Sequence, residues 1–185
     1  MRVRTARPSD LPRVAELAAK LVRQHHALDE ARFMLVEPIA EGYRRFLGGE
    51  LRRKGALVLV AEAEEGDAGG DSDTDGHTDS HSILGYAYAT LEPRNWNDLL
   101  DACGKLNDVF VDPAARRRGV GRALCRAVVA ELTARGAPRV VLMSAWRNPD
   151  AHAFFESLGF RRTMVEMTAE LPPGGASRPR AGGDK

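Results

Sequence analysis

Apolar residues recur with two different periods at the start of the chain. Val3 and Thr5 alternate with charged residues, and this period of two predicts a short strand. From Leu11 to Val22 the apolar positions recur every three or four residues, which predicts a helix capped by Ser9. The same helical spacing returns over residues 37–53 and predicts a second helix.

The next two apolar runs are short and predict a pair of strands. Residues 56–63 are expected to form a buried strand, and residues 83–91, where large and small side chains alternate, its partner. The segment between them, 64–82, is rich in Asp, Gly, Ser and Thr and contains no large apolar side chain. Such a segment buries too little surface to fold, so we predict a disordered hairpin loop.

The second half of the chain alternates between strands and helices. Strands are predicted at 106–111, 139–144 and 162–171, and helices at 119–135 and 149–158. The order β-α-α-β-β-β-α-β-α-β predicts a single α/β domain, with a mixed sheet and helices on both of its faces. We assign residues 1–171 to this domain and predict a disordered tail at 172–185.

The composition excludes several classes of protein. Of the 185 residues 43% are hydrophobic, and 27 basic residues nearly balance 26 acidic ones. This balance argues against a nucleic-acid-binding protein or a membrane-surface protein. Two cysteines are too few for a disulfide framework, and the N-terminus lacks the apolar core of a signal peptide. We therefore expect a cytoplasmic protein.

The most informative segment is the turn between the strand at 106–111 and the helix at 119–135. It reads Arg-Arg-Arg-Gly-Val-Gly from Arg116 to Gly121. Two glycines before a helix leave several backbone N–H groups in one concavity, at the positive end of the helix dipole. With three arginines beside it, this turn is predicted to bind phosphate. The alternative is that the glycines only open the helix and the arginines are solvated.

Several motifs, in their order and spacing, resemble the GNAT superfamily of acetyl-CoA-dependent N-acetyltransferases. They are the strand Val109–Pro113, the Arg-x-x-Gly-x-Gly turn, the helix start Arg122–Leu124, Asn148 with Ala151, and the closing segment Phe154–Phe160. The resemblance covers residues 106–160 closely and the order of elements loosely. It implies a GNAT-like mixed central sheet of six to seven strands with about four helices, in which two parallel central strands splay apart.

The resemblance also implies acetyl-CoA as the co-substrate and places it on the chain. The turn would hold the pyrophosphate, and the pantetheine arm would lie between one splayed strand and Leu142–Ser144 on the other. The residues implied in binding coenzyme A are Phe110, Val111, Arg116, Arg117, Arg118, Gly119, Val120, Gly121, Arg122, Ala123, Asn148 and Phe155. A second interpretation makes Asn148 the N-cap of the helix that follows it.

Acetyl transfer by direct attack needs a base, because a primary amine has a pKa near ~10.4 and is protonated at neutral pH. Polyamine acetyltransferases of this family carry two acidic residues where this chain has Asn107 and Asp108. We predict Asp108 as the base, acting directly or through water, with Glu92 as the fallback. A purely structural carboxylate is the alternative. The backbone N–H of Phe110 is expected to stabilise the oxyanion.

One position departs from the family pattern on the acid side of the reaction. Many members have a tyrosine where this chain has Phe155, and that phenol protonates the leaving sulfur. Phenylalanine cannot do so, which predicts a slower enzyme or a substitute acid. Tyr86 and Tyr88 are the candidates for a substitute.

In the family the first two helices and their connecting loop recognise the acceptor. Here that loop spans residues 25–38 and carries Asp29 and Glu37, which with Glu92 are candidate ligands for a cationic amine. This favours a small polyamine-like or aminoglycoside-like acceptor over a protein or peptide amine. Because Asn107 and Phe155 replace catalytic groups, a non-catalytic acyl-CoA-binding module is the alternative. Family members are often dimers, so a homodimer is one expectation for the assembly.

The acidic run Asp71–Gly76 resembles the start of a calcium-binding loop. The twelfth position of that motif is Ser82 in this chain, where the motif requires a bidentate glutamate. His77 and His81 do not complete a ligand set, and we expect no bound metal.

Overall fold

The computed structural model describes residues 1–64 and 83–171. Its strands are β1 (Arg2–Thr5), β2 (Ala56–Glu62), β3 (Ile83–Glu92), β4 (Cys103–Val111) and β5 (Val140–Leu142). Its helices are α1 (Leu11–Leu28), α2 (Ile39–Glu50), α3 (Val120–Ala134) and α4 (Pro149–Glu156), with short 3-10 turns at Pro8–Asp10 and Pro113–Ala115. The predicted disordered tail, and the predicted loop apart from Glu64, lie outside the described residues.

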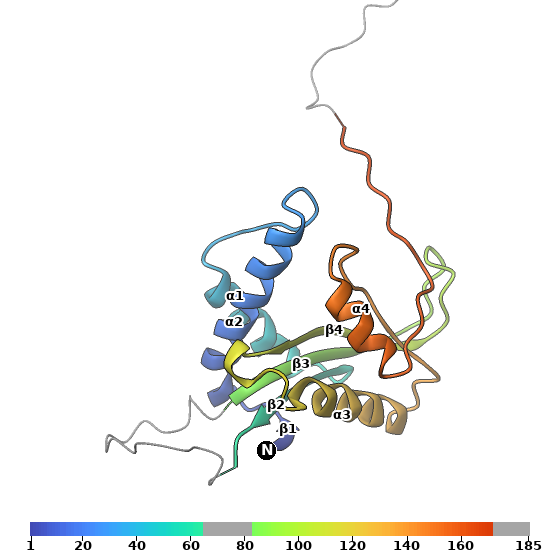
Figure 1. The fold of residues 1–185 in the computed structure, drawn as a ribbon. Coiled ribbons are helices and arrows are strands. Elements are labelled where there is room, and N and C mark those ends of the chain that lie inside the picture. The colour runs from blue at the N-terminus through green and yellow to red at the C-terminus, as the bar shows by residue number, and fades with distance from the viewer. Residues whose placement is uncertain (65–82, 172–185) are drawn as a thin grey trace, which may run out of the picture.

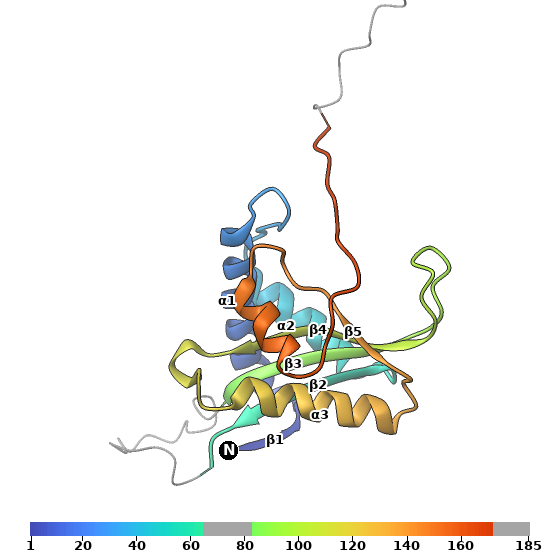
Figure 2. The ribbon, with the colours of Figure 1, turned by 45° about the vertical axis from the view of Figure 1, so that its right-hand side comes forward.

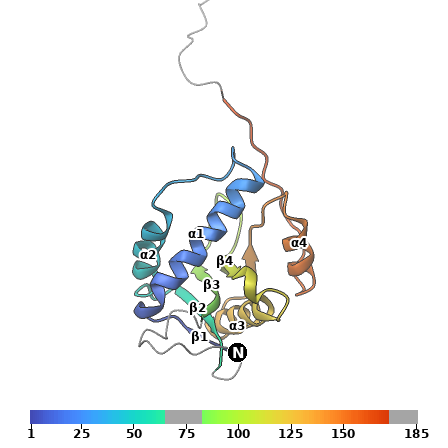
Figure 3. The same cartoon turned by 60° about the vertical axis from the view of Figure 1, so that its left-hand side comes forward.

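Helices cover both faces of one mixed sheet (Figures 1 and 2). The strands lie in the order β1-β2-β3-β4-β5; the first four pair antiparallel, and β5 pairs in parallel with β4. Helices α1 and α2 lie side by side on one face, as Figure 3 shows, and α3 and α4 cover the other. This arrangement confirms the predicted α/β class. Within the described ranges, no helix is long and apolar enough to cross a membrane.

The alternation of side chains along β2 divides the core into two layers. Val58 and Val60 pack against α1 and α2, whereas Leu57 and Leu59 pack against α3. All four are at most 5% exposed. Successive residues of a strand point to opposite faces, so a sheet covered on both faces requires the continuous apolar run that β2 shows.

The start of α1 differs from the prediction. Ser9 lies in a 3-10 turn and does not cap the helix; Asp10 occupies the N-cap position. The buried Asp10 carboxylate accepts hydrogen bonds from Arg4, at 2.7 and 3.1 Å, and from the Arg7 N–H, at 2.6 Å. These bonds join β1 to the start of α1, and this tertiary contact decides where the helix begins.

The predicted strand at 162–171 is wrong, and the described residues contain five strands in place of the expected six to seven. The segment is extended and leads away from the sheet after α4 (Figure 1). Met164 and Met167 are 86% and 91% exposed. A strand needs a neighbour that pairs with its backbone and a layer that buries one of its faces. Alternation of side chains in the sequence supplies neither.

Gly85 marks a close approach of β3 to β4. An added Cβ would lie 2.6 Å from the carbonyl oxygen of Phe110, a backbone atom held in the sheet. Gly85→Ala is therefore expected to lower the free energy of unfolding by about 1–3 kcal/mol in urea denaturation. The control is Gly42→Ala on the exposed side of α2, where nothing lies within 4 Å of the added atom. The free energy of unfolding of that variant should rise by about 0.5–1 kcal/mol. An equal loss of stability in both variants would contradict the explanation.

Candidate functional site

The C-terminal half of β4 has an open edge beside β5. Pairing between the two strands ends at Leu106 and Leu142. At the same point the register between β3 and β4 shifts, which leaves Asn107 as an extra residue in β4. β4 then continues to Val111 with no strand on its outer side among the described residues. An edge of this kind offers backbone hydrogen bonds to an extended ligand that carries amide groups.

A tight turn connects this edge to α3. Arg117 and Gly119 both have left-handed backbone conformations, with φ of 63° and 82°. Glycine adopts this conformation at little cost, whereas Arg117 does so at a cost of about 1–3 kcal/mol. Gly119 is the N-cap of α3 and gives it no side-chain cap, so the first N–H groups of the helix have no side-chain acceptor there. The turn thus has the geometry of an anion site.

The three arginines of the turn have different surroundings. The guanidinium of Arg116 donates to the carbonyl of Val111 at 3.3 Å and to the side chain of Gln24 at 3.2 Å. Arg116 is therefore attached to the open edge of β4 and to α1. All three arginine side chains are exposed.

Asp112 attaches the beginning of the turn to α1. Its carboxylate accepts hydrogen bonds from Arg13 at 2.8 Å, from Lys20 at 2.9 Å and from the Ala114 N–H at 3.1 Å. The bond from Lys20, followed by those from Ala114 and Arg13, outweighs the effect of burial and lowers the pKa of Asp112 to about 2. Sequence reasoning missed this contact because the two cationic partners lie 99 and 92 residues earlier in the chain.

Asn148 caps α4, and Phe154 near the end of that helix lies beside the first turn of α3. The side chain of Asn148 accepts a hydrogen bond from the Ala151 N–H at 3.1 Å, which confirms its interpretation as the N-cap. Its contact with a pantetheine arm stays a prediction. An added Cβ on Gly121 would lie 3.3 Å from the ring of Phe154 and 3.5 Å from Val111. The second glycine of the motif therefore permits α3, α4 and β4 to approach closely.

Phe155 is packed among aromatic rings. Its centroid lies 5.2 Å from that of Phe154 and 5.8 Å from that of Phe160. These rings belong to the layer that α3 and α4 form, whereas Tyr86 and Tyr88 belong to the layer under α1 and α2. Both tyrosines thus lie on the opposite side of the sheet to Phe155.

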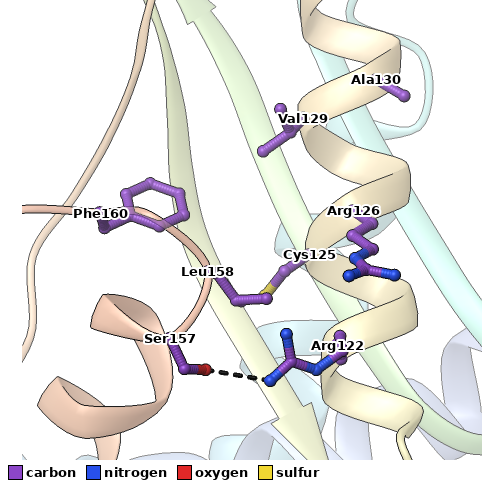
Figure 4. A pocket seen from close by; sticks show the side chains of 8 residues that line it. All are labelled: Arg122, Cys125, Arg126, Val129, Ala130, Ser157, Leu158 and Phe160. Carbon is purple, nitrogen blue, oxygen red and sulfur yellow. Dashed lines mark hydrogen bonds between the residues drawn. The ribbon is translucent and has the colours of Figure 1, made fainter.

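A groove of about 310 Å³ lies between α3 and the segment that follows α4, residues 157–160 (Figure 4). Its lining residues are Arg122, Cys125, Arg126, Val129, Ala130, Ser157, Leu158 and Phe160. Most of this surface is apolar, and two guanidinium groups extend from α3. That of Arg122 donates to the Ser157 hydroxyl at 3.1 Å. Because Arg122 lies in the first turn of α3, the groove begins next to the anion site.

Asp108 follows the extra residue of β4 and lies on the side of the sheet covered by α1 and α2. The carboxylate is partly buried and accepts a hydrogen bond from the Tyr86 hydroxyl at 3.1 Å. Burial raises the pKa of Asp108, and this hydrogen bond offsets part of the rise. A carboxylate with a raised pKa takes up a proton more readily than an exposed one, which suits a general base.

Glu92 is separated from Asp108 along the sheet. It lies opposite Cys103 at the first residue of β4. Its carboxylate accepts a hydrogen bond from the Thr90 hydroxyl, which in turn accepts one from the Asn107 side chain at 3.0 Å. The structure thus connects Glu92 to the extra residue of β4 and not to the turn at Arg116–Gly121.

Asp29 and Glu37, two of the three acidic residues of the α1–α2 loop, have cationic partners within the chain. Glu37 pairs with Arg23 at 2.7 Å. Asp29 accepts a hydrogen bond from the Arg32 N–H and lies 4.0 Å from the guanidinium of Arg147. Their role toward an acceptor stays a prediction. No group of three or more His, Cys, Asp or Glu that could hold a metal lies within residues 1–64 and 83–171, and the acidic run at 71–76 lies outside them.

Comparisons with known proteins agree with this geometry. The model of the acetyltransferase (GNAT) family matches residues 37–160. Glucosamine 6-phosphate N-acetyltransferase 1 of Oryza sativa subsp. japonica is 30% identical over 130 residues, which are 70% of this chain and 69% of that protein. Mycothiol acetyltransferase of Thermomonospora curvata is 33% identical over 91 residues, which are 49% of this chain but only 28% of that protein.

The likeness extends to solved structures. Aminoglycoside N-acetyltransferase AAC(6')-Iy, in a complex with CoA, has a TM-score of 0.68 and 18% sequence identity to this chain. The superposition covers 92% of this chain and 93% of that one, and at this identity it is evidence for the fold alone. The open edge of β4, the turn before α3 and the family match over most of the domain lead to one conclusion: the chain belongs to the GNAT family of acetyltransferases.

Proposed function

We propose that the protein transfers the acetyl group of acetyl-CoA to a primary amine by direct attack. The observation that carries this proposal is the end of β4–β5 pairing at Leu106, shortly before the turn at Arg116–Gly121. The open edge offers hydrogen bonds to the two amides of pantetheine, and the turn offers N–H groups to the pyrophosphate. These two features follow each other along the chain in the order in which coenzyme A would need them.

The groove between α3 and α4 fits the remaining part of coenzyme A, its adenosine 3'-phosphate. The apolar surface of Leu158 and Phe160 suits a base, and the guanidinium groups of Arg122 and Arg126 suit the phosphate. The groove starts at the first turn of α3, so the ligand would continue into it directly from the pyrophosphate.

In the proposed reaction the amine nitrogen attacks the thioester carbon. The protonated amine first gives one proton to Asp108, directly or through water. The C–N bond then forms, the C–S bond breaks, and the attacking nitrogen loses its second proton to water. The backbone N–H of Phe110 stabilises the negative oxygen of the intermediate. Because position 155 carries no hydroxyl, the sulfur leaves as a thiolate, which a pKa near ~8.5 permits.

We propose a small-molecule amine as the acceptor. The relatives named above are acetyltransferases of mycothiol, glucosamine 6-phosphate and aminoglycosides, which supports a small acceptor over a protein. Asp29, Glu37 and Glu92 are the proposed acceptor ligands. Because Arg23 and Arg147 already lie beside the first two, a strongly cationic acceptor would have to replace these ion pairs. This makes an amine of low positive charge a better fit than a polyamine.

Gly121→Glu is expected to weaken the binding of acetyl-CoA by at least about tenfold in calorimetry. The new carboxylate would repel the pyrophosphate, and its Cβ would already crowd Phe154. Gly49→Glu is the matched control. It introduces the same charge on α2, away from the turn, and nothing lies within 4 Å of the added Cβ. Unchanged affinity of the Gly121 variant would show that the turn does not hold coenzyme A.

Release of free CoA from acetyl-CoA should depend on an added amine and on Asp108. In a thiol-reagent assay with amino sugars, aminoglycosides, polyamines and N-terminal peptides, Asp108→Asn is expected to lower kcat by about 10²–10⁴. The affinity for acetyl-CoA should stay within about twofold of that of the unchanged protein, because Asp108 lies outside the turn proposed to bind phosphate. A fall in kcat without a fall in affinity would show that Asp108 acts in catalysis and not in binding. Tight binding without release for any amine would favour a non-catalytic acyl-CoA-binding module.

Phe155→Tyr is expected to raise kcat by up to about 10²-fold, because the new phenol would protonate the leaving sulfur. Phe46→Tyr adds the same hydroxyl to a half-exposed ring on α2 and should leave kcat unchanged. Steady-state kinetics with a saturating acceptor measure both. No gain in the Phe155 variant would mean that thiolate departure does not limit the rate.

A further inference from the structure

The Asp112 carboxylate has hydrogen-bond donors on both of its oxygens. Its Oδ2 atom accepts hydrogen bonds from Arg13 at 2.8 Å and from Lys20 at 2.9 Å. Its Oδ1 atom accepts one from the Ala114 N–H at 3.1 Å. The Asp112 side chain is only 15% exposed, so these charge-assisted bonds are partly shielded from water. Donors on both oxygens hold the carboxylate in one orientation.

The backbone of Asp112 is held as well. Its N–H donates to the carbonyl of Leu84, near the beginning of β3, at 2.8 Å. Its side chain is the N-cap of the 3-10 turn Pro113–Ala115, which is followed directly by Arg116. One residue thus joins the end of β4, the start of β3 and the segment that leads into the turn at Arg116–Gly121.

Helix α1 is a firm support for this contact. Val14, Leu17 and Ala18 of the helix are fully buried in the layer between α1 and the sheet. Arg13 and Lys20 are seven residues apart, about two helical turns, which places them on the same side of α1. The packing of α1 on the sheet therefore decides where the two cations hold Asp112.

Close packing does not replace these bonds. A cavity of about 180 Å³ is lined by residues of α1, of β3 and of the segment after β4, including Arg13, Asp112 and Arg118. A segment that borders a cavity has fewer van der Waals contacts on that side. The bonds of Asp112, with the hydrogen bond of 3.2 Å between Arg116 and Gln24, are therefore what holds this side of the segment to α1.

The charges around Asp112 already neutralise one another. Arg13 also donates to the carboxylate of Glu16, at 3.0 Å. Arg13, Lys20, Asp112 and Glu16 thus form an ion-pair cluster with two positive and two negative charges. A neutral cluster attracts phosphate weakly. Its contribution to an anion site is therefore geometric.

We propose that Asp112, held by Lys20 and Arg13, is a positioning residue for coenzyme A, which keeps the turn at Arg116–Gly121 in the conformation that binds the pyrophosphate. The proposal rests on the function proposed above, in which this turn holds coenzyme A. Asp112 itself acts through the turn and does not contact the ligand.

The turn depends on such support because its conformation is unfavourable. Arg117 has a left-handed backbone, with φ of 63°, which a residue other than glycine keeps only where the surrounding structure enforces it. Without the ion pairs, the turn relaxes in part of the molecules. The affinity for coenzyme A then falls with the fraction of molecules that remain competent to bind.

Asp112→Asn separates geometry from charge. The amide keeps the shape of the side chain and an oxygen for the Ala114 N–H, but it loses the charge that holds Lys20 and Arg13. The variant makes the surroundings of the turn more positive, so an effect of charge alone would strengthen the binding of CoA. Our proposal predicts the opposite, a rise in the Kd of CoA of about fivefold or more.

Lys20→Met tests the same contact from α1, at a side chain that is 45% exposed and whose loss leaves the core intact. The Kd of CoA is expected to rise about threefold or more, less than in Asp112→Asn because Arg13 remains. In the double variant, Lys20→Met should add less than about twofold to the effect of Asp112→Asn, since both remove one contact. A lysine that bound phosphate directly would give its full loss in both backgrounds.

Asp101→Asn is the matched control, just before the other end of β4. The carboxylate of Asp101 accepts hydrogen bonds from Arg94, at 3.0 and 3.3 Å, and from the Ala102 N–H at 2.8 Å. The substitution therefore makes the same change of charge and removes the same kinds of bond away from the turn. It should leave the Kd of CoA unchanged.

The experiment measures the Kd of CoA by calorimetry for the unchanged protein and the four variants, after circular dichroism has confirmed that each is folded. NMR spectra of the free proteins report the turn through the amide signals of Gly119 and Gly121. Asp112→Asn should shift these signals, and Asp101→Asn should not. In steady-state kinetics the KM for acetyl-CoA should rise in Asp112→Asn, whereas kcat stays within about twofold.

Unchanged or tighter binding of CoA by Asp112→Asn overturns the inference, and so does an equal loss in Asp101→Asn. Shifted glycine signals without a loss of affinity also overturn it, because the turn would then bind phosphate in either conformation. Binding of CoA without release of CoA for any amine counts against the proposed transfer reaction, while the values of Kd still decide the role of Asp112. If the unchanged protein does not bind CoA, both proposals fail.

Discussion

The hydrogen-bonding requirement of the β4 backbone is the constraint on which the site depends. A strand inside a sheet needs partners on both edges, and β4 has β3 along its length but β5 only as far as Leu106. The extra residue Asn107 shifts the register at this point, and the outer edge stays open up to Val111. The turn to α3 follows directly, so the open edge and the anion site form one continuous surface.

Two carboxylates on and just after β4 show how the surroundings decide the chemistry of one residue type. Asp112 accepts hydrogen bonds from Lys20 and Arg13, and its pKa falls to about 2. Asp108 is partly buried and accepts a hydrogen bond from the Tyr86 hydroxyl, and burial raises its pKa. The first therefore remains ionised and holds the beginning of the turn against α1, whereas the second takes up a proton more readily. Asp108 and Asp112 are thus only four residues apart, but the first has a proposed catalytic role and the second a structural one.

Local features of the site could be predicted from the sequence because their causes are local. Gly119 gives a left-handed turn, and Asn148 caps α4 through a residue three positions later. The apolar spacing of residues 11–22 predicted the buried part of α1, and the apolar run at 56–63 predicted β2 to within one residue. The prediction failed at 162–171, since alternation alone does not provide the neighbouring strand that pairing requires.

The sequence by itself determined the order of elements from β1 to α4 and the turn before α3, because periodicity and turn chemistry act over a few residues. Only the tertiary structure decided what surrounds Asp108. Tyr86 lies on β3, and nothing in its own segment indicates that its hydroxyl would donate to this carboxylate. The pairing of β3 with β4 and the register shift at Asn107 bring the two side chains together, and both result from contacts between distant parts of the chain.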